Sequence, residues 1–371
     1  MSLDDISVGV IHTNSSILPM SKLFTKALKK IFKEQSDIDV EVYPEFVGQG
    51  GLRQVEEAVS KMINFHDVDV VTGIVSSKVV MDLADKFRDK DILFLPNNLG
   101  EQILNPAKVP DNVYLNSPLL WQQLWSLGHW ATKKFGNKGM FVGGVYDMAY
   151  TFTHMLDLGM RAADPNCKWS FAVSHMPQDG EKLSNPTVVF DYIEEEAPDF
   201  LFAAFCGEEA TLFLEEYIDR GLHEKVPLVT TPYLLEDFSR KIDEPLSIYT
   251  ALSAGKALTG KDLLEDWATP SGLFSSMGRD SARIILKAAG SGDITDLPNA
   301  FETERGMVNI EPQESGKASQ VYIIENKHAG RKAEIKPSIV EKVVSITIDN
   351  EKIIEGFNNI ETSWQNPYLG V

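Results

Sequence analysis

The sequence predicts an α/β protein with two doubly wound, parallel-sheet lobes. Short apolar runs rich in β-branched residues recur from the N-terminus to about residue 235, with segments of helical spacing between them. This alternation of strands and helices requires crossover connections and hence parallel sheets. A turn-forming sequence at residues 116–118 interrupts the alternation and divides the strands into two sets. The length of 371 residues also favours two domains, at about 100–200 residues each.

The first set of strands precedes residue 116, where the sequence holds about five strand signals. Several are continuously apolar, as expected for strands covered on both faces. In the first helix, Phe24, Leu28 and Phe32 step by four, and lysines lie mostly on the other face. The expected strands are residues 6–11, 38–43, 68–74 and 92–95, and the expected helices are 23–32, 55–63 and 79–87.

The second set of strands runs to residue 231, and a mixed segment follows that must complete both lobes. The second set comprises strands at 140–146, 169–174, 200–205 and 228–231, and helices at 119–135, 150–163, 188–193 and 210–218. The mixed segment comprises strands at 247–253, 307–310, 320–325 and 344–348, and a helix at 278–289. Because ligands of such sheets bind beyond the carboxyl ends of the strands, two facing lobes would share one cleft.

Composition excludes several classes of function. The chain has 35 Lys and Arg residues and 54 Asp and Glu residues, which gives a net charge of −19. A surface this acidic repels nucleic acid and anionic lipid, so we do not expect them as partners. No apolar run approaches the ~18 residues of a membrane span. Cys167 starts one predicted strand and Cys206 ends another. Parallel strands would place them at opposite ends of a sheet, so we expect two free thiols.

Catalytic and cofactor motifs are absent from the sequence. The seven histidines are scattered, and there is no His-Glu-x-x-His helix, no Gly-x-Ser-x-Gly elbow and no P-loop. We therefore expect no cofactor, no metal site and no enzymatic reaction. No signal peptide precedes the first predicted strand, which fits either a cytosolic protein or a secreted one whose signal has been removed.

An ordered series of short motifs between residues 6 and 325 resembles the type I periplasmic solute-binding proteins. Within that family, the chain looks like the branched-chain amino-acid and amide receptors of ABC importers. Residues 6–11 are similar to the family's opening strand, and residues 73–77 resemble its Gly-x-x-Ser-Ser turn. Residues 148–150 stand where the family has a cleft tyrosine, and residues 277–282 look like its Tyr-Asp-Ala helix start.

The resemblance implies a binding protein, periplasmic or on the cell surface, that delivers a small ligand to an ABC permease. The ligand would be an amino acid, carboxylate or amide with an apolar part, and closure of the lobes around it would be a hinge motion. Three crossings, near residues 117, 250 and 327, would join the lobes. Lobe one would then be residues 1–117 plus 251–327, and lobe two residues 118–250 plus 328–371.

Other functions remain compatible with the same fold. A ligand-sensing receptor or an amide-responsive cytosolic regulator would use a similar cleft without delivering its ligand to a permease. An enzyme on a doubly wound fold is a third hypothesis, and it lacks a visible nucleophile or acid–base pair in the sequence.

The sequence departs from the family pattern in several places. Residues 33–37 replace the Gly-Gly-x-x-Gly segment, and residues 97–100 stand where small residues should follow the fourth strand. Residues 230–233 lack an evident counterpart of the acidic residue that holds a ligand ammonium in the family. These departures argue against an α-amino-acid ligand.

The polar candidates for the ligand site follow predicted strands of the first lobe. Ser76 and Ser77 open a helix, where hydroxyl and free N–H groups suit a carboxylate; the alternative is capping without a ligand. Asn97 and Asn98 can both donate to and accept from a polar ligand, although asparagine is also common in loops. Leu99 continues the same segment.

Aromatic residues are expected to line the cleft. The resemblance places Tyr150 over the ligand and Phe274 above the cleft. Trp121 begins the first helix of lobe two, and Phe205 and Tyr233 lie at the ends of strands in that lobe. For each of these aromatics, packing in the interior is the alternative.

Overall fold

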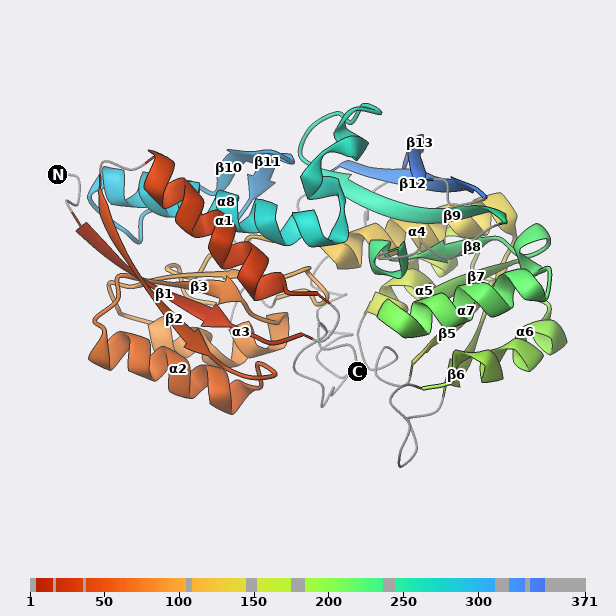
Figure 1. The fold of residues 1–371 in the computed structure, drawn as a ribbon, viewed down its shortest axis with the longest axis horizontal. Helices are drawn as coiled ribbons and strands as arrows, with labels where there is room; N and C mark the ends of the chain where they lie inside the picture. The colour runs from red at the N-terminus through yellow and green to blue at the C-terminus, as the bar shows by residue number, and fades with distance from the viewer. Residues whose placement is uncertain are drawn as a thin grey trace.

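The computed structural model describes residues 5–15, 18–35, 38–104, 109–144, 152–174, 184–235, 244–310, 320–330 and 334–343. Two α/β lobes lie side by side along the long axis of the molecule, each around its own sheet (Figure 1). The predicted α/β fold with two parallel-sheet lobes is confirmed.

Four parallel strands form the sheet of the first lobe. They are β1 (Asp5–His12), β2 (Asp39–Phe46), β3 (Val70–Ile74) and β4 (Leu93–Asn97), in the spatial order β2-β1-β3-β4. Helices α1 (Met20–Gln35) and α8 (Pro270–Ser291) cover one face, and α2 (Leu52–Phe65) and α3 (Ser77–Leu83) cover the other (Figure 1). Val70 packs under the first pair and Val71 under the second, which explains the continuously apolar strand.

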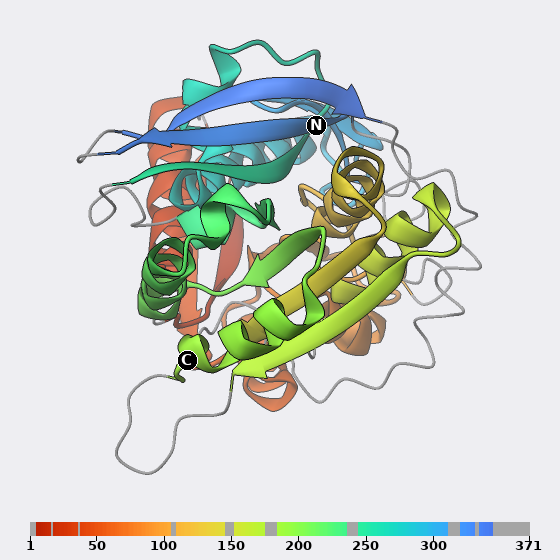
Figure 2. The same ribbon diagram turned by 90° about the vertical axis from the view of Figure 1, so that its right-hand side faces the viewer.

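Seven strands form the sheet of the second lobe. They are β5 (Lys138–Gly144), β6 (Lys168–Ser174), β7 (Phe200–Ala204), β8 (Leu228–Thr230), β9 (Pro245–Ala254), β12 (Gln320–Ala329) and β13 (Lys336–Val343). Their order is β13-β12-β9-β8-β7-β5-β6, so β13 and β6 lie at opposite edges of the twisted sheet (Figure 2). β5 to β9 pair in parallel, whereas β12 is antiparallel to both β9 and β13.

Helices cover both faces of this second sheet as well. α4 (Leu120–Phe135) and α5 (Phe152–Ala163) pack on one face, and α6 (Phe190–Glu196) and α7 (Gly207–Asp219) pack on the other. Short 3₁₀ turns occur at Ala84–Phe87, Pro186–Val189, Leu222–Glu224, Pro232–Leu235, Asp262–Leu264 and Asp266–Ala268. Cys167 and Cys206 are not joined in a disulfide, as predicted.

After β9 the chain returns to the first lobe, where α8 lies beside α1. α8 begins eight residues before the predicted helix, because Thr269 caps it by accepting the Gly272 N–H at 3.1 Å and Pro270 occupies its first turn. The hairpin of β10 (Ala300–Thr303) and β11 (Gly306–Asn309) follows. The strand β10 had no clear signal in the sequence.

Several boundaries differ from the sequence expectations. Only isolated bridges from Val113 and Asn116 to β4 correspond to a fifth strand signal in the first lobe. The crossings expected near residues 250 and 327 fall inside β9 and β12, which pair along their whole length. The edge strand β13 was not predicted, and the expected strand at 344–348 lies outside the described residues. The division of the chain into lobes by residue number stays a prediction.

Two glycines allow α4 and α5 to approach each other closely. A Cβ at Gly159 would lie 2.0 Å from the carbonyl oxygen of Trp125, and one at Gly128 would lie 2.3 Å from that of Leu156. In both cases the added Cβ would meet backbone atoms of the facing helix, which cannot rotate away as a side chain could. The helix pair therefore depends on these residues having no side chain.

The substitution Gly159→Ala is expected to destabilise the protein by about 1–3 kcal/mol, because the helices must separate to admit the methyl group. Gly290→Ala is the matched control, since nothing lies within 4 Å of its Cβ position in α8. It should leave the stability unchanged or raise it by up to ~1 kcal/mol. Urea denaturation of the purified variants measures both effects, and equal stabilities would contradict the close-packing account.

Candidate functional site

A small cavity lies where the two lobes meet, at the carboxyl ends of β4 and β8. Its volume is about 30 Å³, and it is lined from the first lobe by Leu99, Leu273 and Arg305 and from the second by Tyr233. Gln123 at the start of α4, Ser253 near the end of β9 and Thr269 before α8 add polar groups to the lining. The cavity has room for about one or two water molecules. This position at the strand ends is where ligands of α/β sheets bind.

The protein itself bonds the Ser76 hydroxyl and the Ser77 N–H, whereas the buried Ser77 Oγ has no hydrogen-bond partner among the described residues. The Ser76 Oγ accepts the Val79 N–H at 3.4 Å and caps α3, and both serines are buried. The Ser77 N–H donates to Glu101 Oε1 at 2.7 Å, and Glu101 is only 2% exposed. A carboxylate of the chain therefore occupies the place where the sequence predicted a carboxylate of the ligand.

Asn97 and Asn98 have protein partners for their side-chain amides. The Asn97 Nδ2 donates to Thr72 Oγ1 at 3.2 Å, and its Oδ1 accepts from the side chains of Asn116 (2.8 Å) and Ser281 (2.9 Å). Asn98 donates to the Val75 carbonyl at 3.2 Å and accepts the Gly100 N–H at 2.9 Å. Both are fully buried, which favours the structural role over ligand binding.

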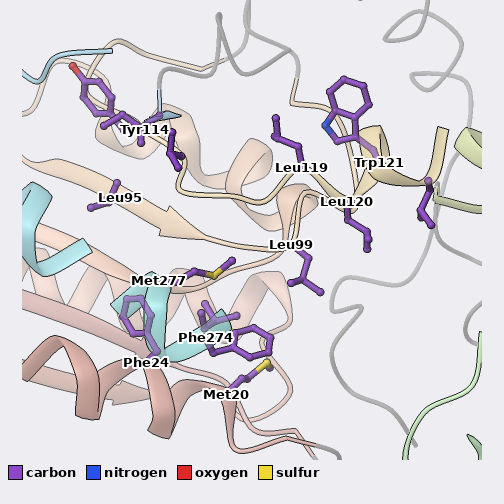
Figure 3. Close-up of a cluster of buried hydrophobic side chains, with 14 of the residues drawn as sticks. Met20, Phe24, Leu95, Leu99, Tyr114, Leu119, Leu120, Trp121, Phe274 and Met277 are labelled. Carbon is purple, nitrogen blue, oxygen red and sulfur yellow. The ribbon is translucent and has the colours of Figure 1, made fainter. Parts of the chain in front are cut away.

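Three of the predicted cleft aromatics are buried in the hydrophobic interior. Phe205 stacks on Phe213, with ring centroids 4.9 Å apart. Phe274 packs beside Met20 and Met277 in the first lobe, and Trp121 is 2% exposed at the start of α4 (Figure 3). The packing alternative is favoured for all three.

Two predicted site residues do lie at the interlobe cavity. Leu99 and the partly buried Tyr233 both line it, one from each lobe. Tyr150 lies outside the described residues. The structure thus brings Leu99 and Tyr233 of the predicted set together at the cavity, whereas Phe205 packs in a different hydrophobic cluster.

Sequence reasoning missed a buried charged group next to this cavity. Arg305, 3% exposed, lies in the turn between β10 and β11. Its Nη2 donates to Asn116 Oδ1 at 2.5 Å and to Asp280 Oδ2 at 3.3 Å. Burial raises the pKa of the Asp280 carboxyl, and the Arg305 charge opposes that rise. The Thr-Glu-Arg-Gly sequence that contains Arg305 is typical of an exposed turn. In the sequence, only Asp280 in α8 indicated that Arg305 could have a buried partner.

Two further kinds of site, a metal site and a membrane span, are not found in the described parts of the chain. Among them, no group of His, Cys, Asp and Glu side chains is arranged to hold a metal ion. None of the helices in these parts combines the length and apolarity needed to cross a membrane.

Two sheets that point their carboxyl ends at one junction define the class of type I periplasmic binding proteins. Residues 48–246, more than half of the chain, match the family model described as periplasmic binding protein. The chain therefore belongs to the periplasmic binding protein family. Because this family binds solutes without transforming them, the protein is not an enzyme, as the sequence predicted.

Solved structures of solute-binding proteins share the fold at low sequence identity. A Rhodopseudomonas palustris ABC-transporter solute-binding protein in complex with benzoate has a TM-score of 0.66 and 15% identity, over 92% of this chain and 98% of that one. The leucine-binding protein LivK of Thermotoga maritima has a TM-score of 0.62 and 14% identity, over 91% and 98% of the two chains.

Streptococcus pneumoniae LivJ in complex with isoleucine is similar to the chain at a TM-score of 0.63 and 14% identity, over 92% of this chain and all of that one. None of the curated protein sequences compared with the chain matches it.

The substitution Glu101→Ala is expected to destabilise the protein by about 1–3 kcal/mol, because it leaves the buried Ser77 N–H without its carboxylate acceptor. Glu101→Gln keeps an acceptor oxygen and should cost less. Glu302→Ala, on the exposed side of β10, is the control and should stay within ~0.5 kcal/mol of the wild type. Thermal unfolding compares the three, and a stable Glu101→Ala protein would contradict this assignment.

Proposed function

We propose that the protein is the solute-binding component of an ABC importer, acting in the periplasm or on the cell surface. It captures one small carboxylate- or amide-containing ligand between its lobes and delivers it to a permease. The observation that supports this most is the cavity at the junction, which takes its lining from the carboxyl ends of both sheets. A ligand there touches both lobes at once, so its binding favours the closed arrangement.

The lining favours a ligand with an apolar body and a polar end. Leu99, Leu120, Leu252 and Leu273 supply apolar surface, and Tyr233 adds an aromatic ring. Among the described residues that line the cavity, none is acidic. A free α-ammonium group would therefore lack an anionic partner, which favours deaminated acids and amides over α-amino acids.

In this proposal the lobes separate to admit the ligand to the cavity at their junction. Ligand sites commonly measure about 300–1,000 Å³, whereas this cavity measures about 30 Å³. The chain crosses between sheets after β4, after β9 and again before β12, and we propose the first two of these connections as the hinge. Residues up to the first crossing together with 255–310 would then move as lobe one.

A thermal-shift screen of refolded protein tests the proposal with aromatic carboxylates, keto and hydroxy acids, aliphatic amides and amino acids. A ligand at 100-fold over its dissociation constant adds about 2.7 kcal/mol to the stability. Tyr233→Ala should weaken binding of the best ligand at least tenfold, because the ring loses its contact with the apolar body.

Tyr192→Ala is the matched control, since Tyr192 lies in α6 and is 59% exposed. It should bind like the wild type. A Tyr233→Ala protein with unchanged affinity would contradict binding at this junction, and no shift with any compound would contradict the ligand class.

A further inference from the structure

We propose that Arg305 receives the carboxylate of the ligand, so that the ligand is a small monocarboxylate rather than a neutral amide. This inference rests on the proposed function and adds the charge of the ligand and the place of its polar end. The geometry points to a single contact, from the guanidinium Nε–H to one carboxylate oxygen.

Arg305 is held in place by buried partners of the first lobe. It follows β10, and its Nη2 donates to Asn116 Oδ1 at 2.5 Å and to Asp280 Oδ2 at 3.3 Å. Asp280 lies in α8 and Asn116 lies just before α4. Contacts from two different segments orient the guanidinium group, which a long exposed side chain would leave free to rotate.

One donor of this group is not used by the protein. The Nε of Arg305 is buried and has no hydrogen-bond partner among the residues that the structure describes. A buried charged N–H without an acceptor is unfavourable, and an oxygen supplied from the adjoining cavity would relieve it. The unpartnered Nε is thus the donor that a ligand can claim without breaking an existing bond.

Arg305 supplies the positive charge of the cavity lining. It is the one charged residue among the described residues of the lining. The neutral polar neighbours bond to each other and to the backbone, since Gln123 Nε2 donates to Ser253 Oγ at 3.0 Å and to the Pro118 carbonyl at 2.9 Å. A ligand carboxylate entering the cavity therefore meets Arg305 before any competing donor of equal strength.

Asp280 does not cancel this cation completely. Its second oxygen, Oδ1, lies 4.0 Å from Arg283 Nη1, which also lies 3.7 Å from Glu304 Oε1, so only Oδ2 of Asp280 bonds to Arg305. The Ser77 N–H, the alternative place for a ligand carboxylate, is already bonded to Glu101. The cavity of about 30 Å³ admits the head group alone, and the apolar body would lie against Leu99 and Tyr233 once the lobes separate.

Isothermal titration with matched pairs of ligands tests the assignment: benzoate against benzamide, and 4-methylpentanoate against 4-methylpentanamide. The wild type is expected to bind the acid of at least one pair ten times or more tighter than its amide. Arg305→Gln with Asp280→Asn, which removes both charges of the ion pair together, should abolish that preference. Arg305→Lys keeps the charge without the Nε donor and should fall between.

Arg279→Gln is the control, because Arg279 pairs with Glu304 at 2.6 Å and does not line the cavity. It should keep the wild-type preference, and thermal melts of each variant establish that it is folded. A double variant that still prefers the acid, or a wild type that prefers the amide, would overturn the role of Arg305 while leaving the proposed function intact. Binding to neither member of either pair would contradict both.

Discussion

A buried network of polar side chains holds together segments of the first lobe that lie between residues 97 and 305 of the chain. Asn97 at the end of β4 accepts hydrogen bonds from Asn116 and from Ser281 in α8, and Asn116 in turn accepts from Arg305. Asp280 closes the network through its ion pair with Arg305. These residues are almost completely buried, and each bond lost would leave a polar group without water or a partner. The network therefore holds α8 and the β10–β11 hairpin against the sheet of the first lobe.

The need to pair buried polar groups also determines where the two lobes join. Ser253, near the end of β9, donates to the Pro118 carbonyl at 2.5 Å, and Gln123 bonds to both residues. Two of the connections between sheets thus lie against each other at a buried, hydrogen-bonded contact. In the proposed hinge motion this contact would be the pivot, with the strands on either side moving as rigid bodies. The cavity lies beside this contact, so the motion would change the surroundings of a ligand bound there.

Most of the architecture could be predicted from the sequence, because strands buried on both faces leave long apolar runs. Val70 and Val71 in β3 pack into different clusters, and such a strand can hardly be mistaken for a surface segment. The strand β13 was missed, because this edge strand alternates with charged residues and carries little apolar signal. The start of α8 was missed because Thr269 and Pro270, rather than apolar periodicity, determine it.

The site was less predictable than the fold. Leu99 and Tyr233 could be placed near the cavity, because both follow the carboxyl end of a strand. Asn97 and Ser77 follow strands too, yet their partners Ser281 and Glu101 are revealed only by the packing. Arg305 lies 189 residues from its partner Asn116, in a turn that looks exposed. Burial by distant segments leaves no local pattern, so the group proposed to bind the ligand could be found only in three dimensions.

Hydrogen exchange with and without the best-binding carboxylate tests the central claim, that the ligand lies between the lobes and touches both. The account predicts slower exchange at the same ligand concentration in residues 98–104 and 266–273 of the first lobe and in residues 231–235 of the second. Protection confined to one lobe, or located away from this junction, would contradict binding at this junction.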